Sequence, residues 1–217
     1  MINLYRFLPI LCLLVPGSAG AIDPGMPNPP ASPTLVDVGL FIADIVDMDE
    51  VNENFRMELI LIADWHDPRL AFDAKAEGTD IKIFQGAYQF SEVFSGWWPQ
   101  LFILNEVGHG DFNAIKIEVY ADGHVRYLEQ RNVLLETPMT LAKFPFDTQH
   151  LKAFIIPFGN NAEQVKLRIN ETMQEATNEY VNRHGSMVNI AEWSLENVHM
   201  TTVTMSNYAY NGKKEHL

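Results

Sequence analysis

The sequence predicts an all-β fold, an immunoglobulin-like antiparallel β-sandwich of about nine to ten strands with a short N-terminal helix or helical turn. Short segments in which apolar and polar residues alternate recur along the chain, and turn residues separate them. The 217 residues suffice for one good-sized hydrophobic core. Three regions are expected: a signal peptide at 1–21, a Pro-rich lead-in at 22–34 and a single sandwich domain at 35–217.

The N-terminus has the features of an export signal. Arg6 precedes the apolar run from Phe7 to Val15, and Ala19-Gly20-Ala21 offers the small residues that signal peptidase prefers. The run is too short for a spanning helix, and Pro16 and Gly17 follow it closely. The chain is therefore expected to be exported, to the periplasm or to the extracellular face of the cell membrane.

Composition limits the partners. Cys12 is the only cysteine and would leave with the signal, so core burial or assembly must hold the domain, which mildly favours an oligomer. Fifteen Lys and Arg against 28 Asp and Glu give a formal charge of −13, which disfavours nucleic-acid binding and attracts cationic ligands. Solubility alone would also account for an acidic chain. After the signal no apolar run is long enough to span a membrane.

The clearest strand runs from Phe55 to Trp65. Its core face is expected to consist of Phe55, Met57, Leu59, Leu61, Ala63 and Trp65. On the opposite face Ile60 and Ile62 are apolar where water is expected, which indicates an interface.

A hairpin is predicted further along. Ile115 to Tyr120 alternates, Asp122-Gly123 turns the chain, and Val125 to Leu135 returns. Three later segments also favour strands. They are Lys152 to Ile156, a candidate central strand ended by Pro157, then Val165 to Ile169, and Trp193 to Met205, which suggests one or two strands. A short helical spacing occurs from Phe84 to Phe94.

An enzyme or metal site has little support. The histidines are scattered without ligand spacing, and His109-Gly110-Asp111 has no nucleophile elbow beside it, so a polar turn is favoured. The acidic segment from Asp44 to Glu53 suggests calcium by charge but lacks the loop that organises its ligands. No catalytic residue, metal site or cofactor is predicted.

A binding module is better supported, because aromatic residues fall in the predicted loops. Phe158 lies in Pro157-Phe158-Gly159-Asn160, and Tyr208 and Tyr210 lie near the C-terminus. Aromatic faces held by loops on a rigid sandwich can enclose an organic cation. Packing at the sheet edges is the alternative for each of these side chains.

Five motifs occur in order. They are Asp49-Glu50-Val51-Asn52; Trp65-His66-Asp67-Pro68-Arg69-Leu70; Trp97-Trp98-Pro99-Gln100 followed by Asn105; Tyr120 to Tyr127 with Gly123 and Val125; and Thr137 to Leu151, which contains Phe144-Pro145-Phe146-Asp147. Together they resemble the extracellular domain of pentameric ligand-gated ion channels, the Cys-loop receptor family. Thr137 and Leu151 stand where that family has its two cysteines, so the resemblance is to the bacterial type without the disulfide.

The resemblance implies a homopentamer that binds a small ligand between subunits, with a cationic amine as one candidate, and that gates a cation or anion pore. The principal binding face would be Leu104, Phe158, Tyr208 and Tyr210. The complementary face would be Ile60, Ile62 and Tyr127. Coupling to the pore at the membrane end would involve Glu50, Val51, Phe144, Pro145, Phe146 and Asp147.

Three features depart from the family pattern. Leu104 stands where many animal receptors have Tyr, and Gln100 replaces the usual Asp. The chain also stops at Leu217, about where a last strand and four membrane helices should follow. A truncated channel that joins the membrane through the missing pore is favoured. The alternatives are a soluble secreted ligand-binding protein of the same fold and a periplasmic sandwich enzyme or carbohydrate-binding module.

Overall fold

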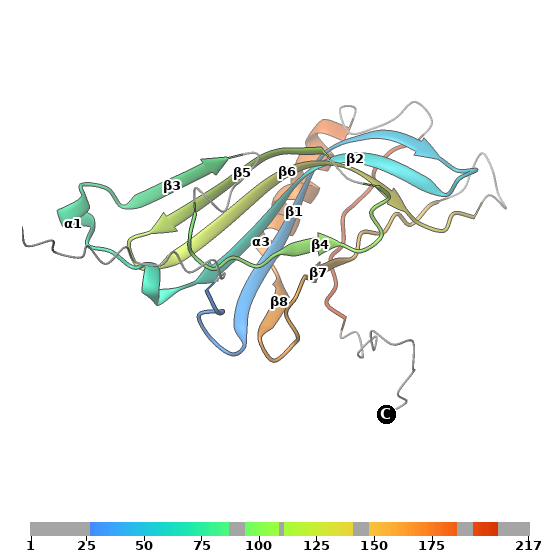
Figure 1. The fold of residues 1–217 in the computed structure, drawn as a ribbon. Helices are drawn as coiled ribbons and strands as arrows, with labels where there is room; N and C mark the ends of the chain where they lie inside the picture. Colours follow the sequence, from blue (N-terminus) through green and yellow to red (C-terminus); the bar gives the residue numbers. More distant parts are fainter. Residues whose placement is uncertain (1–26, 87–93, 109–110, 141–147, 186–192, 204–217) are drawn as a thin grey trace, which may run out of the picture.

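A computed structural model describes residues 27–86, 94–108, 111–140, 148–185 and 193–203 (Figure 1). The strands in these residues are β1 (Thr34–Asp49), β2 (Asn54–His66), β3 (Ile81–Gly86), β4 (Leu101–Ile103), β5 (Asp111–Tyr120), β6 (His124–Glu136), β7 (Ile155–Pro157) and β8 (Val165–Ile169). The helical elements are η1 (Pro68–Leu70), α1 (Ala74–Glu77) and α3 (Glu171–His184). The described chain is mostly β, as the sequence predicts.

Six strands form one sheet in the order β3-β5-β6-β2-β1-β8. Each neighbouring pair is antiparallel except β1 and β8, which are parallel. This pair departs from the predicted antiparallel arrangement. The chain reaches β8 from β7 in the other sheet rather than by a hairpin from β1, so the connection does not impose an antiparallel direction.

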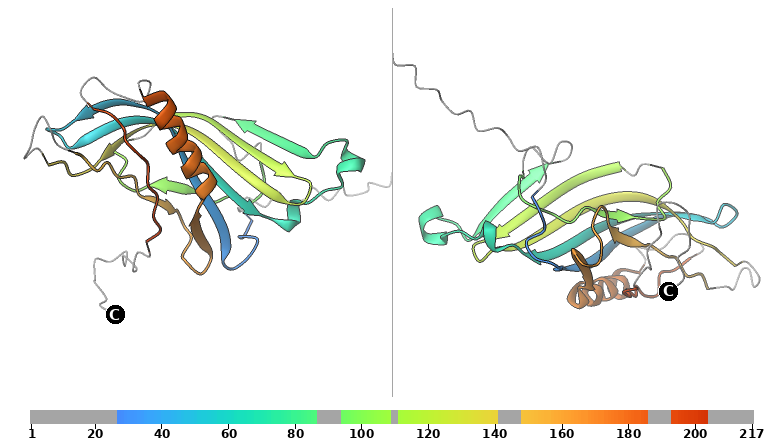
Figure 2. Two further views of the ribbon diagram at one scale, coloured as in Figure 1. Left: turned by 180° about the vertical axis from the view of Figure 1, so that it is seen from behind. Right: turned by 60° about the horizontal axis from the view of Figure 1, so that its bottom comes forward.

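The two-stranded β4–β7 sheet and α3 lie on opposite faces of the six-stranded sheet (Figures 1 and 2). Leu101 and Ile103 of β4 join the core that Leu59 and Leu61 of β2 and Ile117 of β5 build from the large sheet. The result is a sandwich with a helix on its outer side. The six-stranded sheet therefore has one face in the core and one face partly covered by α3.

The alternation predicted for β2 is confirmed. Phe55, Met57, Leu59, Leu61, Ala63 and Trp65 are each at most 3% exposed. Because side chains alternate between the two faces of a strand, this places Ile60, Ile62 and Asp64 on the face toward α3.

The Asp-Gly hairpin is confirmed between β5 and β6. Gly123 has a φ of 86°, a left-handed conformation that favours glycine, and its N–H donates to the Tyr120 carbonyl at 2.9 Å. The Gly123 carbonyl accepts from the Asp67 N–H at 2.8 Å. The hairpin is thereby tied to the segment that follows β2.

α3 was not expected from the sequence, although its signals are present. Asn170 caps the helix by accepting from the Met173 N–H at 3.1 Å, and Glu171 lies in the first turn where the helix dipole favours a negative charge. Thr177 and Val181 are spaced by four residues and are the buried residues of the helix. An Asn-Glu-Thr stretch that matches a glycosylation pattern is thus a helix start in this fold.

The strands predicted for Trp193 to Met205 are not formed in its described part, residues 193–203, where only Trp193 makes an isolated bridge. Side chains of α3 take the place of a partner strand. Asn178 bonds both the Val198 N–H at 2.7 Å and the Val198 carbonyl at 2.9 Å. Gln174 accepts from the Met200 N–H at 2.6 Å.

Two smaller expectations also need correction. The predicted strand from Lys152 is limited to Ile155–Pro157, at the edge of the small sheet. The helical spacing from Phe84 begins inside β3, because Phe84 pairs with Ile117. The short helices of the described part, η1 and α1, follow β2.

Candidate functional site

The β4–β7 sheet presents an exposed apolar surface. This surface, named here the β4–β7 patch, consists of Phe102, Leu104, Phe154 and Phe158. Phe158 is 62% exposed, and its ring lies 6.3 Å from that of Phe102 between centroids. Leu104 and Phe158, two residues predicted for the principal binding face, lie at opposite ends of this surface, Leu104 beside Phe154 and Phe158 beside Gln100. Contiguous exposed apolar area of this kind marks interaction sites.

Backbone bonds hold the two strands of the patch in register. The Leu104 N–H donates to the Phe154 carbonyl at 2.8 Å, and the Phe158 N–H donates to the Gln100 carbonyl at 2.6 Å. The Asn105 amide adds a side-chain clamp that reaches both the end of β6 and the segment before β7. It donates to the carbonyls of Glu136 and Lys152 and accepts from the Phe154 N–H.

Ile60 and Ile62, predicted for the complementary face, lie on the side of the sheet that α3 covers. Ile62 is only 6% exposed and pairs with Gly39 across the β1–β2 ladder. A Cβ on Gly39 would lie 2.6 Å from the Met173 Cβ, so α3 sits directly on this part of the sheet. Tyr180 of α3 packs on Phe41, the ladder partner of Ile60. α3 therefore covers the apolar surface that Ile60 and Ile62 form on the outer face of the sheet.

Tyr127, the third residue predicted for the complementary face, is buried on the core side of β6. Its ring stacks on Trp98 with centroids 5.5 Å apart, and its hydroxyl donates to Glu129 Oε2 at 2.8 Å. Burial and the neighbouring Glu129 carboxylate raise the pKa of the Tyr127 hydroxyl well above its usual range. The phenol is thus a fixed hydrogen-bond donor inside the sandwich.

Glu129 belongs to a buried charged cluster that sequence reasoning missed. With Tyr127, Arg131 and Glu106 it forms the group named here the β6 charge cluster. The signal in the sequence was Glu129 and Arg131 at positions where the alternation of the predicted strand expects apolar residues.

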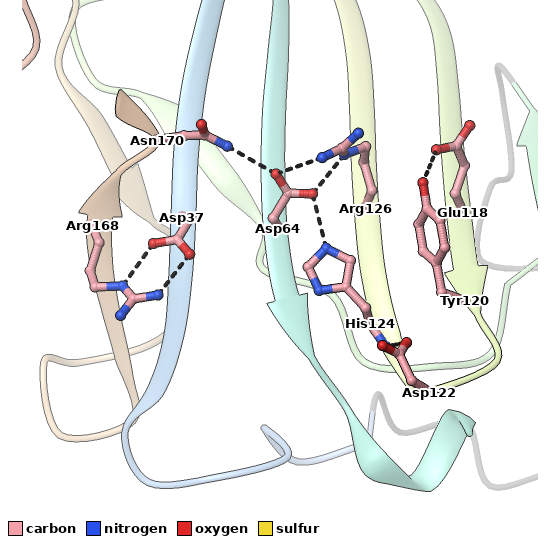
Figure 3. Close-up of polar contacts among 9 residues, drawn as sticks. All are labelled: Asp37, Asp64, Glu118, Tyr120, Asp122, His124, Arg126, Arg168 and Asn170. Carbon is pink, nitrogen blue, oxygen red and sulfur yellow. Dashed lines mark hydrogen bonds and ion pairs between the residues drawn. The ribbon is translucent and has the colours of Figure 1, made fainter. Parts of the chain in front are cut away.

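A second polar network lies on the α3 side of the sheet, centred on Asp64 (Figure 3). Arg126 Nε lies 2.7 Å from Asp64 Oδ1, and Asn170 Nδ2 lies 3.0 Å from Oδ2. His124 Nε2 approaches the same carboxylate at 3.5 Å. The hydrogen bond that Arg126 donates to the Asp64 carboxylate raises the pKa of the Arg126 guanidinium. Because Asn170 caps α3, Asp64 fastens the start of that helix to β2 and β6.

Figure 3 also shows a separate ion pair at the β1–β8 edge of the sheet. Arg168 of β8 makes two bonds of 2.7 Å to the Asp37 carboxylate of β1. This bidentate contact bridges the parallel pair.

The turn between β1 and β2 carries two residues predicted to couple to a pore, half-buried Glu50 and exposed Val51. Asp49 accepts from the N–H groups of Val51 and Asn52 at 3.1 and 2.9 Å, and bonds with Asn52 lower the pKa of its carboxyl. Val51 is 86% exposed at the turn. Glu50 Oε1 accepts from Trp193 Nε1 at 2.8 Å.

The ends of the signature segment from Thr137 to Leu151 approach one another without a disulfide. The Thr137 hydroxyl donates to the His150 carbonyl at 3.4 Å, and the Thr137 N–H donates to the Glu53 carbonyl at 2.9 Å. The Gln149 amide exchanges two hydrogen bonds with the Thr140 backbone. Hydrogen bonds thus close the loop where the family uses a covalent bond.

Several predicted residues lie outside the described part of the chain. They are Phe144, Pro145, Phe146, Asp147, Tyr208 and Tyr210, together with His109 of the weak acid-base candidate and the signal peptide at 1–21. Within the described ranges, no three or more His, Cys, Asp or Glu side chains are grouped to hold a metal ion. The helices of that same part include none with the length and apolar character needed to cross a membrane.

Comparison with known protein families identifies the class. The model of the neurotransmitter-gated ion-channel ligand-binding domain matches residues 23–216. This match covers nearly the whole chain, and the chain belongs to that family.

Individual ligand-gated channels are also similar to this chain. A proton-gated ion channel from Gloeobacter violaceus is 28% identical over 145 residues, covering 66% of this chain and 38% of the relative. The human glycine receptor subunit beta is 27% identical over 146 residues, which are 64% of this chain and 28% of that subunit. A glutamate-gated chloride channel from Drosophila melanogaster is 29% identical over 143 residues, covering 64% and 30% of the two chains. The matched part spans well under half of each relative.

Proposed function

We propose that this chain is the ligand-binding part of an exported, homopentameric ligand-gated channel that binds a small ligand between neighbouring subunits. The observation that carries the proposal is the β4–β7 patch. Leu104 and Phe158, two residues that the family resemblance assigns to the principal binding face, lie on one exposed surface, and Phe158 is 62% exposed. Large exposed aromatic residues are typical of binding interfaces.

The principal face of the proposed site consists of Leu104 and Phe158, with Tyr208 and Tyr210 expected to complete it. The complementary face of the neighbouring subunit is built around Ile60. Ile62 is buried beside Ile60 on the same face of β2, and Tyr127 is buried on the core side of β6, so both act there by supporting the strands that carry that face. Glu50, Val51 and Phe144 to Asp147 form the end of the domain that meets the pore, and exposed Val51 provides an apolar contact there.

The ligand is proposed to be a small molecule or ion. Aromatic residues on the principal face suit an organic ammonium group, each contact contributing about 0.5 to 2 kcal/mol. Leu104 leaves the aromatic cage incomplete, so weak selectivity among amines is expected. The names of the relatives supply three effectors to test: protons, glycine and glutamate.

The test expresses the reading frame that contains this chain in voltage-clamped cells and applies acid, glycine and glutamate in turn. A current evoked by any of the three supports the channel function. For an amino-acid effector, Phe158→Ala with Tyr210→Ala should raise the half-maximal concentration about tenfold or more. Ile83→Ala is the matched control, since Ile83 is an exposed apolar residue on β3 outside the patch.

Two results would contradict parts of the proposal. An unchanged half-maximal concentration in the double variant would remove the aromatic residues from the site. Binding of an effector by the purified chain, with no current from the expressed frame, would identify a soluble ligand-binding protein instead.

A further inference from the structure

The β6 charge cluster places two acids and one base in the interior of the sandwich. Glu129 is 1% exposed, and the side chains of Arg131 and Glu106 are also buried. Burying an ion is costly unless it is paired, so the pairing in this cluster decides its charge state.

The contacts within the cluster form a chain. Tyr127 donates its hydroxyl proton to Glu129 Oε2 at 2.8 Å, and Arg131 Nε lies 2.7 Å from Glu129 Oε1. The same guanidinium reaches Glu106 Oε2 through Nη1 at 3.3 Å. With both carboxyls ionised the group carries one uncompensated negative charge, because one guanidinium serves two carboxylates.

On the described strands beside the cluster, the residues paired with Glu129 and Arg131 in the sheet are apolar. On the neighbouring strands, Leu61 of β2 and Ile115 of β5 pair with Glu129, and Leu59 of β2 pairs with Arg131. In the described part of the chain, the titratable and charged groups that act on Glu129 are Arg131, Tyr127 and Glu106. Burial raises the pKa of the Glu129 carboxyl and outweighs the opposing charge of Arg131, while Glu106 adds to the increase.

Glu106 connects the cluster to the proposed ligand face. It follows β4 two residues after Leu104, between two backbone bonds to the end of β6. The Val107 N–H donates to the Leu134 carbonyl at 2.8 Å, and the Glu136 N–H donates to the Asn105 carbonyl at 3.0 Å. A change in the electrostatic attraction between Arg131 and Glu106 therefore shifts the segment that carries Leu104.

We propose that the β6 charge cluster is a proton-binding site that makes the ligand face of this domain sensitive to acid. Uptake of one proton from solvent by Glu129 neutralises that carboxyl, weakens its attraction for Arg131 and so strengthens the pairing of Arg131 with Glu106. The distance between Arg131 Nη1 and Glu106 Oε2, 3.3 Å in this structure, then shortens, and the segment from Leu104 to Val107 packs more firmly on β6. The role in gating depends on the proposed channel function, whereas proton binding itself does not.

Hydrogen exchange of the purified chain tests the switch. After correction for intrinsic exchange rates, the amides of Val107 and Glu136 should become about threefold to tenfold more protected between about pH 8 and about pH 5. Glu129→Gln, which mimics the protonated acid, should show the acid level of protection throughout. Glu118→Gln is the matched control, because Glu118 pairs with Lys116 on the other face of the sheet and should leave the response unchanged.

A flat pH response in the unmodified chain, or a Glu129→Gln variant that responds as the unmodified chain does, would overturn the proposal. If Glu129→Gln does not fold, the carboxyl resonance of Glu129 in the unmodified chain is titrated by NMR. A midpoint above those of exposed glutamates is expected, and a midpoint at or below them would overturn the proposal.

The two proposals fail in different ways. If protection at Val107 and Glu136 follows pH while no effector evokes a current, the channel function is wrong and the proton switch stands. If currents are evoked but protection is independent of pH, the switch is wrong and the channel function stands.

Discussion

Glu129 and Arg131 occupy positions on β6 where strand alternation expects apolar side chains. Their neighbours on the same face, Val125, Val133 and Leu135, are buried and apolar. A buried ion pair rarely stabilises a fold more than a hydrophobic pair of the same volume would. Stability therefore does not explain why Glu129 and Arg131 are charged, whereas the proposed proton binding by Glu129 does.

One prediction at the residue scale concerns the pH dependence of stability. The pKa of Glu129 is raised above its ordinary value of 4.5, so the folded chain binds this proton more tightly than the unfolded chain. The resulting stabilisation is fully present below about pH 4.5 and is lost as the pH rises through the native pKa. Urea unfolding at a series of pH values measures this component, which Glu129→Gln should lack.

Comparing the pH dependence of stability in the unmodified chain and in Glu129→Gln isolates the contribution of Glu129. Asp49 and Glu118 have lowered pKa values and contribute the opposite slope, but they do so equally in both proteins. Identical pH slopes in the two proteins would show that Glu129 does not bind the proton.

A second prediction concerns Gly123 in the β5–β6 hairpin. A Cβ there would lie 2.7 Å from the Asp67 carbonyl oxygen, and the residue has a φ of 86°. Gly123→Ala should lower the unfolding free energy by more than about 2 kcal/mol, since it adds overlap to the strain of the left-handed conformation. Denaturant unfolding measures the loss.

Gly78→Ala is the matched control for this variant. Gly78 has a φ of 71° but nothing within 4 Å of an added Cβ, so only the conformational cost of about 1 to 2 kcal/mol applies. Equal losses for the two variants would show that contact with Asp67 is unimportant.

At the scale of elements, α3 is the feature that most alters the outer face of the sheet. It rests on Gly39 through Met173, bonds the Leu40 carbonyl through the Thr177 hydroxyl at 2.7 Å, and begins at Asn170 beside Asp64. Figure 2 shows the helix running across the face opposite β4 and β7. The helix thereby determines how much of Ile60 and Ile62 a neighbouring subunit could reach.

Gly39→Ala should loosen α3 without unfolding the sheet. The added Cβ would overlap the Met173 Cβ and Cγ, at 2.6 and 2.9 Å, and overpacking of this kind costs about 1 to 3 kcal/mol. Amide exchange in α3 should therefore accelerate about fivefold to a hundredfold, while exchange in β2 stays slow.

Thr177→Val provides the comparison, because it removes the hydroxyl bond to Leu40 but keeps the side-chain shape. Its effect on α3 should be smaller, since one net hydrogen bond contributes about 1 kcal/mol. Equal acceleration in α3 and β2 after Gly39→Ala would mean that helix and sheet open as one unit.

At the scale of the whole molecule, the two faces of the sandwich differ in what they offer a partner. The side with the β4–β7 patch is apolar and exposed, whereas the opposite side is covered by α3 and by the ion pairs around Asp64 and Asp37. An assembly that joins unlike faces of neighbouring copies can close into a ring.

The proposed assembly predicts that the patch drives association. Phe102→Ser with Phe158→Ser should weaken association of the chain about tenfold or more, because aromatic anchors dominate interface energies. Sedimentation equilibrium measures this, and circular dichroism verifies that the fold persists. Ile83→Ser on β3 is the matched control and should leave association unchanged. Unaltered association in the double variant would place the subunit contact elsewhere.

Local rules account for the parts of the fold that the sequence predicted. The core face of β2 and the hairpin at Gly123 follow from alternation and from turn chemistry, which act between residues close in the chain. The family motifs likewise involve short-range contacts. Asp67, for example, accepts from the Arg69 N–H at 3.0 Å and pairs with its guanidinium.

The sequence by itself determined the family, the β class and the position of Phe158 in a loop. The tertiary structure decided the parallel β1–β8 edge, the helix over Ile62 and the burial of Tyr127 with Glu129. These depend on contacts between residues far apart in the chain, such as Asn170 with Asp64 and Arg131 with Glu106. Neither alternation nor local propensity encodes such contacts, because whether a side chain is buried depends on what the rest of the chain places against it.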